Sequence, residues 1–168
     1  NQMIFDKYEQ IKDLHFNVII VGSGPAGITL ALELEKKKIS SLIIEAGNKN
    51  FSENSQKFYE GEIIGDKYAD LSVSRLRQFG GSSGHWGGVC RTLESTDFIE
   101  WPIKKDDLEV YSNKARKVLN LKRNNFYKKE FSNIFDLVKF EISPLRFRDK
   151  YYDQIKKSKY INLINNSY

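Results

Sequence analysis

A glycine-rich turn and an acidic residue that follows it carry the strongest chemical signal in this sequence. The turn is Gly22-Ser23-Gly24-Pro25-Ala26-Gly27, and Glu45 lies 18 residues beyond its end. Glycines at this spacing let the backbone leave a strand sharply, approach a pyrophosphate closely and pack a helix tightly. The start of that helix offers unpaired N–H groups and a partial positive charge to phosphates. The spacing therefore predicts a dinucleotide site.

Each residue of this unit has an expected part. Pro25 suits the first turn of the helix, where a missing N–H costs nothing. The Glu45 carboxylate is expected to accept hydrogen bonds from the ribose diol, and it would repel a 2′-phosphate, so NADP is a poor fit. The residues expected to hold the cofactor here are Gly22, Gly24, Pro25, Ala26, Gly27, Glu45 and Ala46.

The elements needed to position the turn are present within residues 16–47. An apolar, β-branched run at 18–21 is typical of a buried parallel strand, a helical stretch follows the turn, and a second apolar run at 42–44 ends at Glu45. A glycine turn alone is weak evidence, but strand, turn, helix, strand and acid in this order are specific. The order predicts an α/β fold with a Rossmann-like dinucleotide-binding domain. This unit alone does not separate FAD from NAD.

A second glycine-rich segment lies at residues 77–91. Five of the nine residues from Gly80 to Gly88 are glycine, which is unsuited to a core strand or helix and suits a backbone lying against a flat ring system. The alternative is a flexible linker, but Phe79 and Trp86 flank the glycines and require burial. The candidate cofactor contacts of this segment are Gly80, Gly81, Ser82, Ser83, His85 and Trp86.

Together these blocks resemble the N-terminal portion of the FAD-dependent glucose–methanol–choline (GMC) oxidoreductases. The resemblance extends along nearly the whole chain through Glu45-Ala46-Gly47, Asp97-Phe98, Trp101-Pro102-Ile103, Asp107-Leu108 and Tyr111. It implies that the dinucleotide is FAD. It also implies that the complete enzyme oxidises an alcohol or sugar hydroxyl, with a base taking the proton while hydride passes to the flavin.

The run from Gly80 to Trp86 is most similar to the branch of pyranose 2-oxidase and related sugar dehydrogenases. The histidine of this block carries the flavin covalently in pyranose 2-oxidase, so the resemblance implies a covalent FAD link at His85. A neutral imidazole nitrogen is a competent nucleophile for that bond. Here Trp86 is followed by Gly87-Gly88, as in many members of the family, which leaves a noncovalent flavin contact by His85 as the alternative.

The catalytic pair of the family, a histidine base with a histidine or asparagine partner, has no match in this sequence. His15 and His85 are the two histidines, and neither occupies that place. No catalytic residue is therefore assigned, and the isolated chain is expected to turn over no alcohol. The base would come from further residues or from a second chain supplying the C-terminal half.

Two other interpretations stay open. One is a noncatalytic flavin- or nucleotide-binding remnant. The other, an NAD-dependent dehydrogenase, leaves the 80–88 segment without a role.

The sequence predicts an FAD-binding domain over 1–121 and the truncated beginning of a substrate domain over 122–168. The first would hold the dinucleotide unit, the flavin loop at 77–91 and a packing helix at 105–121. Patterns in the remaining residues predict a loop at 122–130, a strand or short helix at 134–142, a helix at 151–158 and a strand at 160–164.

Composition and charge bear on the partners and the location of the protein. A net charge of +5 comes from scattered lysines without an aromatic-and-basic motif, so no nucleic-acid partner is expected. The longest apolar runs are far shorter than the 18 or more residues of a membrane span, and no metal site is predicted. Cys90 is the single cysteine, which excludes an internal disulfide and favours a reducing, cytoplasmic location.

Overall fold

The computed structural model describes residues 3–122, 128–130, 136–138 and 140–167. The chain forms two compact units: unit 1 comprises residues 1–86 and 146–168, and unit 2 comprises residues 87–145. The helices are α1 (Pro25–Lys36), α2 (Glu53–Gln56), α3 (Leu71–Ser74), α4 (Lys105–Glu109), α5 (Ser112–Val118) and α6 (Phe147–Lys156). The strands are β1 (Ile4–Phe5), β2 (Val18–Val21), β3 (Ser41–Ile44), β4 (Val89–Cys90), β5 (Lys128–Glu130), β6 (Asp136–Val138), β7 (Glu141–Ile142) and β8 (Ile161–Ile164).

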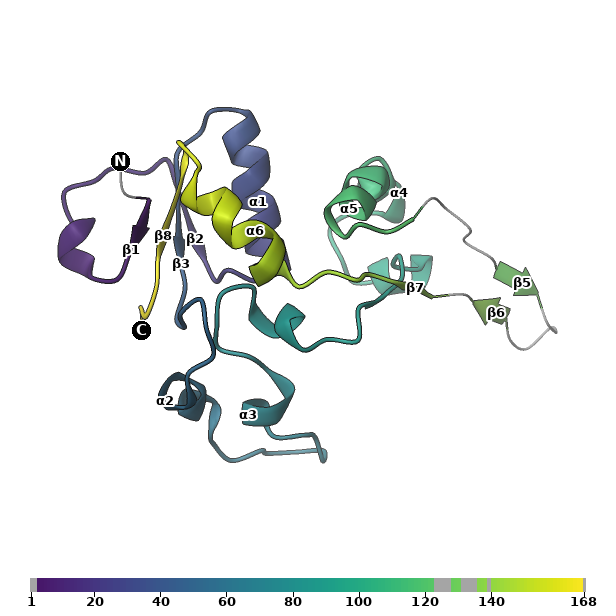
Figure 1. The fold of residues 1–168 in the computed structure, drawn as a ribbon. Coiled ribbons are helices and arrows are strands. Elements are labelled where there is room, and N and C mark those ends of the chain that lie inside the picture. The colour runs from purple at the N-terminus through teal and green to yellow at the C-terminus, as the bar shows by residue number, and fades with distance from the viewer. Residues whose placement is uncertain (1–2, 123–127, 131–135, 139, 168) are drawn as a thin grey trace. The chain divides into compact units, whose positions relative to one another are not determined.

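Unit 1 is built on a four-stranded parallel sheet in the order β1-β8-β3-β2 (Figure 1). Val18 of β2 lies opposite Ser41 of β3, and Ser41 lies opposite Ile161 of β8, so three strands begin level with one another. Their carboxyl ends consequently meet at one edge of the sheet. The Rossmann-like α/β fold is thereby confirmed. The strand that lies next to β3 on the side away from β2 is β8, which comes from near the end of the sequence.

The two faces of this sheet are covered by different segments. Helices α1 and α6 lie on one side, where Ile28, Ile43, Ile155 and Leu163 are fully buried (Figure 1). On the other face a smaller apolar cluster joins the N-terminal segment to the sheet, through Phe5, Ile11, Leu42 and Ile164. Parallel sheets need apolar cover on both faces. Strands β3 and β8 have apolar cover on both faces, and the glycine turn follows β2 beside them.

The helix predicted over 105–121 is interrupted. The structure has α4 and α5 instead, with residues 110–111 in a turn between them. At this point the chain places β-branched Val110 and aromatic Tyr111 before Ser112 and Asn113. The first two lose side-chain freedom in a helix, and the last two favour helix starts, so a new helix begins there.

The two units divide the chain differently from the predicted boundary at residue 121. Helix α6 and strand β8 belong with the sheet of unit 1, because the apolar strand 161–164 completes the parallel ladder beside β3. Residues 87–121, expected in the FAD-binding domain, belong to unit 2. Of the predicted flavin loop at 77–91, residues 77–86 belong to unit 1 and residues 87–91 belong to unit 2.

The remaining sequence expectations are met in part. Helix α6 begins four residues before the predicted 151–158, and β8 matches the strand expected at 160–164. Within the predicted loop at 122–130 the structure has a short strand, β5, and within 134–142 it has β6 and β7. Residues 123–127, 131–135 and 139 lie outside the described residues.

Unit 2 contains two antiparallel strand pairs, β4 with β7 and β5 with β6. Arg116 of α5 pairs with Glu141 of β7 through both guanidinium branches, and Arg116 also donates to the Lys122 carbonyl. The side chains of Arg116 and Glu141 are 10% and 15% exposed. This buried pair therefore ties α5 to the strand pair β4–β7.

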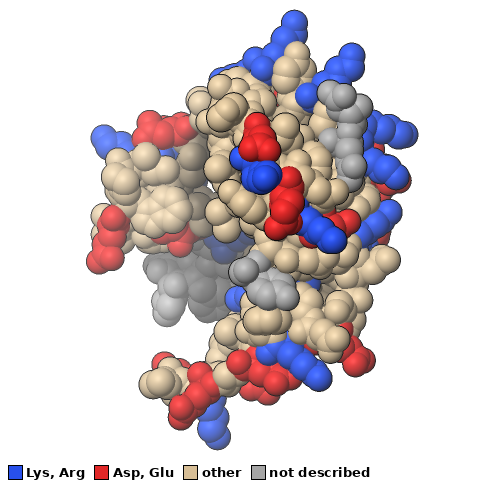
Figure 2. All heavy atoms as spheres, turned by 90° about the vertical axis from the view of Figure 1, so that its left-hand side faces the viewer, with Lys and Arg blue, Asp and Glu red and all other residues tan. Residues whose placement is uncertain are grey.

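Charged side chains of both signs are spread over the protein surface. Lys and Arg lie among Asp and Glu on the face drawn in Figure 2, without a continuous basic surface there. None of the helices in the described ranges combines the length and the apolar character that crossing a bilayer requires.

Candidate cofactor site

The glycine turn emerges at the carboxyl edge of the sheet in the geometry that a dinucleotide requires. Gly22 has φ of +94°, and its N–H donates to the Ile44 carbonyl at 2.8 Å. A Cβ on Gly27 would lie 2.1 Å from the Gly22 carbonyl oxygen, so only glycine lets α1 approach β2 this closely. A Cβ on Gly24, in contrast, would meet no atom within 4 Å. The open space over Gly24 is where a phosphate would lie.

Helix α1 starts at this turn with its N–H groups toward the open space. Gly24 is the N-cap residue, and Pro25 is the first helical residue, as expected. The amides at the start of a helix have no partner within the helix. They and the helix dipole make this end of α1 suitable for a pyrophosphate.

Glu45 is buried at the end of β3, with 5% of its surface exposed. One carboxylate oxygen, Oε2, accepts from the Ser23 amide at 3.0 Å and from the Ser23 hydroxyl, and the other accepts from the Gly47 amide at 2.8 Å. A carboxylate has about four acceptor positions, and these three donors leave one for a ribose hydroxyl. The predicted acid therefore also holds the glycine turn.

The second glycine-rich segment lies directly against the first. Residues Gly81–Gly84 form one 3-10 turn, and the preceding Gly80 has φ of +85°. The Gly80 amide donates to the carbonyl of Ser23 at 3.0 Å and to its hydroxyl at 3.1 Å. A Cβ on Gly81 would lie 3.5 Å from the Gly24 Cα. Two segments far apart in the sequence thus form one surface of bare backbone.

The aromatic residues that flank this segment anchor it. Phe79 is fully buried and meets the Tyr152 ring edge-on at 5.1 Å. Trp86 is half-buried against Phe147, with ring centroids 6.2 Å apart. The requirement that Phe79 and Trp86 be covered is met, which argues against a flexible linker.

Two predicted contacts on this segment differ in how they are held. The Ser82 hydroxyl accepts from the Leu76 amide at 3.2 Å, which leaves its proton for another acceptor. His85 is exposed at the end of the 3-10 turn, with its amide on the Ser82 carbonyl at 3.2 Å. Its imidazole is therefore accessible to a ligand.

Three buried polar residues of this region were not singled out by the sequence. Ser23 occupies a variable place in the glycine motif, and Gln56 and Arg77 lie in stretches without a clear period. The Gln56 amide donates to the carbonyls of Ser72 and Arg75 at 2.7 and 2.6 Å and accepts from the Arg77 amide at 3.0 Å. These bonds hold the two ends of the segment 57–76 together, and the chain then continues to Phe79. No local pattern encodes such a long-range contact.

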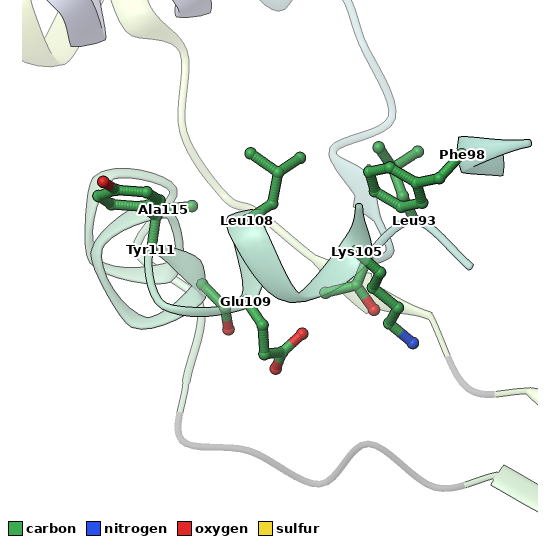
Figure 3. Close-up of a pocket in the computed structure, with 9 residues that line it drawn as sticks. Leu93, Phe98, Lys105, Leu108, Glu109, Tyr111 and Ala115 are labelled. Carbon is green, nitrogen blue, oxygen red and sulfur yellow. The ribbon is translucent and has the colours of Figure 1, made fainter. Parts of the chain in front are cut away.

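Unit 2 contains a cavity of 230 Å³. It is lined mainly by apolar side chains, among them Leu93, Phe98, Leu108 and Tyr111 (Figure 3). None of the predicted cofactor contacts lines it. It is therefore distinct from the predicted dinucleotide site.

Comparison with known proteins decides the nature of the cofactor. Residues 15–57 match the family model of an FAD binding domain. This range contains β2, the glycine turn, α1, β3 and Glu45. The chain contains an FAD-binding domain. The buried acid, the open space over Gly24 and the adjoining backbone of Gly81 fit FAD, whose isoalloxazine is the flat ring system that the second segment suits.

Two curated relatives are thioredoxin reductases, from Listeria innocua and Listeria monocytogenes. Each is 31% identical to this chain over an alignment of 90 residues, and the match covers 49% of the chain. The chain spans 27% of the length of these relatives. The similarity is thus to one part of a longer protein.

Proposed function

We propose that this chain is the FAD-binding portion of an oxidoreductase of GMC type, which oxidises an alcohol or sugar hydroxyl. The observation that carries the proposal is the contact between the two glycine-rich segments, where Gly81 lies against Gly24 and Gly80 is bonded to Ser23. A nucleotide alone needs only the first segment. A second backbone surface beside it suits a ligand that extends beyond the pyrophosphate, as the flavin of FAD does.

The residues of the chain have distinct parts in this proposal. Glu45 would accept from the ribose, the start of α1 would hold the pyrophosphate, and the 80–86 segment would lie along the ring. Bound FAD supplies the hydride acceptor, its flavin ring. His85 would contact that ring, covalently or otherwise.

The base for the substrate hydroxyl would come from polypeptide beyond these residues, and the edge of the sheet supports this. Val18 and Gly22 bond toward β3, so the alternate residues Ile19 and Val21 direct their backbone groups to the other side. Their side chains are 60% and 84% exposed, and β2 has no second partner strand among the described residues. A parallel sheet is rarely left with a bare apolar edge. A further strand from the rest of a longer protein, or from a second chain, would cover it.

The relatives favour a second candidate, a reductase of disulfides. Both relatives are named as thioredoxin reductases. A disulfide reductase works through a pair of cysteines, and these 168 residues hold Cys90 alone. Each candidate needs a group from other polypeptide, a second cysteine for the disulfide reductase and a base for the GMC type. The contact of the 80–86 segment with the glycine turn is what favours the GMC type.

The test uses the FAD-loaded protein purified in its native length from its own cells. Under anaerobic conditions, we expect sugars or primary alcohols to bleach the flavin absorbance and NADPH to leave it unchanged. Bleaching by NADPH alone would contradict the proposal and favour the disulfide reductase. Bleaching by neither would favour the noncatalytic remnant. The intact mass of the same sample reports whether FAD is covalently attached, with His85→Ala as the variant that should release it.

A further inference from the structure

Gly80 is held on both sides by buried serine hydroxyls. Its amide donates to the Ser23 hydroxyl at 3.1 Å, and its carbonyl accepts from the Ser83 hydroxyl at 2.6 Å. Ser23 is fully buried, and Ser83 is 2% exposed. Gly80 itself lies in the left-handed region, and a Cβ there would meet the Arg148 amide at 2.7 Å. The position of the 80–84 turn is therefore set by these two hydroxyls together with the Ser23 carbonyl, which accepts from the same Gly80 amide at 3.0 Å.

The Ser23 hydroxyl connects this turn to the acid of the nucleotide site. Its single proton goes to Glu45, which leaves its lone pairs for the Gly80 amide. Because the proton has one acceptor and the oxygen has one donor, the hydroxyl has a fixed orientation. A displacement of Glu45 is consequently transmitted to Gly80 through Ser23, whose hydroxyl and backbone each bond to both residues.

The Ser83 hydroxyl makes the corresponding connection on the other side. It accepts from the Phe147 amide at 3.2 Å, at the first residue of α6, while it donates to Gly80. Among the described residues, the donors to the Glu45 carboxylate are Ser23 and Gly47, and Ser83 is not one of them. The two serines thus differ: Ser23 touches both ends of the cofactor site, and Ser83 touches the flavin end alone.

We propose that Ser23 and Ser83 are positioning residues that fix the flavin-facing turn, and that Ser23 couples this turn to the ribose-binding acid. The inference rests on the proposed FAD site and assigns the two serines different effects on ligand binding. Ser23 should affect binding of both the nucleotide half and whole FAD. Ser83 should affect binding of whole FAD alone.

The test compares the affinities for ADP and FAD of the purified protein and its Ser23→Ala and Ser83→Ala variants. Ser40→Ala is the matched control, because Ser40 also donates to a side-chain oxygen and accepts a backbone amide, from Asn17, at the opposite end of β2 and β3. We expect Ser23→Ala to weaken both ligands about tenfold, as the loss of a charge-assisted hydrogen bond does. We expect Ser83→Ala to weaken FAD alone, and Ser40→Ala to weaken neither.

Amide hydrogen exchange at Gly80 gives a reading that needs no ligand. Exchange should be faster in Ser23→Ala, where the Gly80 amide keeps the Ser23 carbonyl but loses the hydroxyl, and in Ser83→Ala, where the turn loses its second hydroxyl bond. It should be unchanged in Ser40→Ala. Wild-type ADP and FAD affinities in a folded Ser23→Ala variant, or unchanged exchange at Gly80, would overturn the proposal. If Ser23→Ala does not fold, equal losses of ADP and FAD affinity in Ser83→Ala overturn it. If the wild-type protein binds no FAD, the FAD site itself fails, while exchange at Gly80 still decides the role of the serines.

Discussion

At the scale of single residues, Glu45 has a structural and a ligand-binding part. The sequence predicted the acid from its place after the second strand. It did not predict that the same carboxylate receives both Ser23 donors and the Gly47 amide, because these bonds depend on how the two turns meet. The acid therefore stabilises the empty site as well as the bound one.

We predict that Glu45→Gln destabilises the protein even without a ligand. The new amide group would place its N–H donors against one of the N–H donors that now bond to the carboxylate. Loss of hydrogen bonds to a buried charge costs about 1.5–3 kcal/mol. Thermal unfolding measures the effect. Glu33→Gln, which removes the surface pair with Lys36, is the control and should change stability by less than about 1 kcal/mol.

Cys90 gives a second prediction at this scale. Burial raises the pKa of its thiol, and the nearby Glu141 carboxylate adds to the increase, while a backbone hydrogen bond from Ser143 opposes it. The thiolate is the reactive form, and a raised pKa lowers its population at neutral pH. Alkylation of Cys90 by iodoacetamide should therefore be slower at pH 7 than that of a free cysteine, and should accelerate only at alkaline pH. A neutral-pH rate equal to that of free cysteine would contradict this.

At the scale of elements, the strand–turn–helix–strand unit followed from the sequence because its signals are local. β-Branched runs, glycine spacing and helix periodicity all act within a few residues. The pairing of β3 with β8 joins segments about 120 residues apart and leaves no local signal. The interruption between α4 and α5 was missed because apolar spacing continued across it.

The two glycines of the turn should separate folding from binding. A Cβ in Gly27→Ala would lie 2.1 Å from the Gly22 carbonyl, and such overpacking costs about 1–3 kcal/mol or more. Gly24→Ala has open space and an ordinary φ of −66°, so its stability should be unchanged while its FAD affinity falls. Thermal unfolding and FAD titration of both variants test this. A stable Gly27→Ala variant would show that α1 is less closely packed than described.

In unit 2, the pair between Arg116 and Glu141 should be required for order. Removing one partner leaves a buried charge uncompensated, which costs about 3–5 kcal/mol. Arg116→Ala should therefore make residues 87–145 sensitive to limited proteolysis. Replacing the exposed Arg91, which pairs with Glu94 on the surface, is the control and should leave the cleavage pattern unchanged.

At the scale of the whole molecule, β2 lies at the edge of the described sheet and carries exposed apolar side chains. Ile19 and Val21 are exposed, and β2 pairs only with β3 within the part of the chain that the structure describes, which favours pairing with another strand. We predict that the purified 168-residue chain associates with itself and that Ile19→Lys reduces this. Sedimentation velocity measures it, with Leu30→Gln on α1 as the control for removal of an exposed apolar side chain. A monomeric wild-type chain would contradict the prediction.

The organisation into units shows what the sequence leaves undetermined. Residues 146–168 read as the end of a second region, because nothing near them indicates the sheet to which they belong. Their place became evident only from the parallel register of β8 with β3 and β1. The predictions of a cytoplasmic location, a sugar or alcohol substrate and a flavin link at His85 remain predictions.

Hydrogen exchange with and without FAD would show whether the two glycine-rich segments form one FAD site. FAD should slow amide exchange in residues 22–28 and in residues 79–86 of the same sample. Protection of the first segment alone would mean that the chain binds a nucleotide without engaging the flavin ring, which would contradict a single site built from both segments.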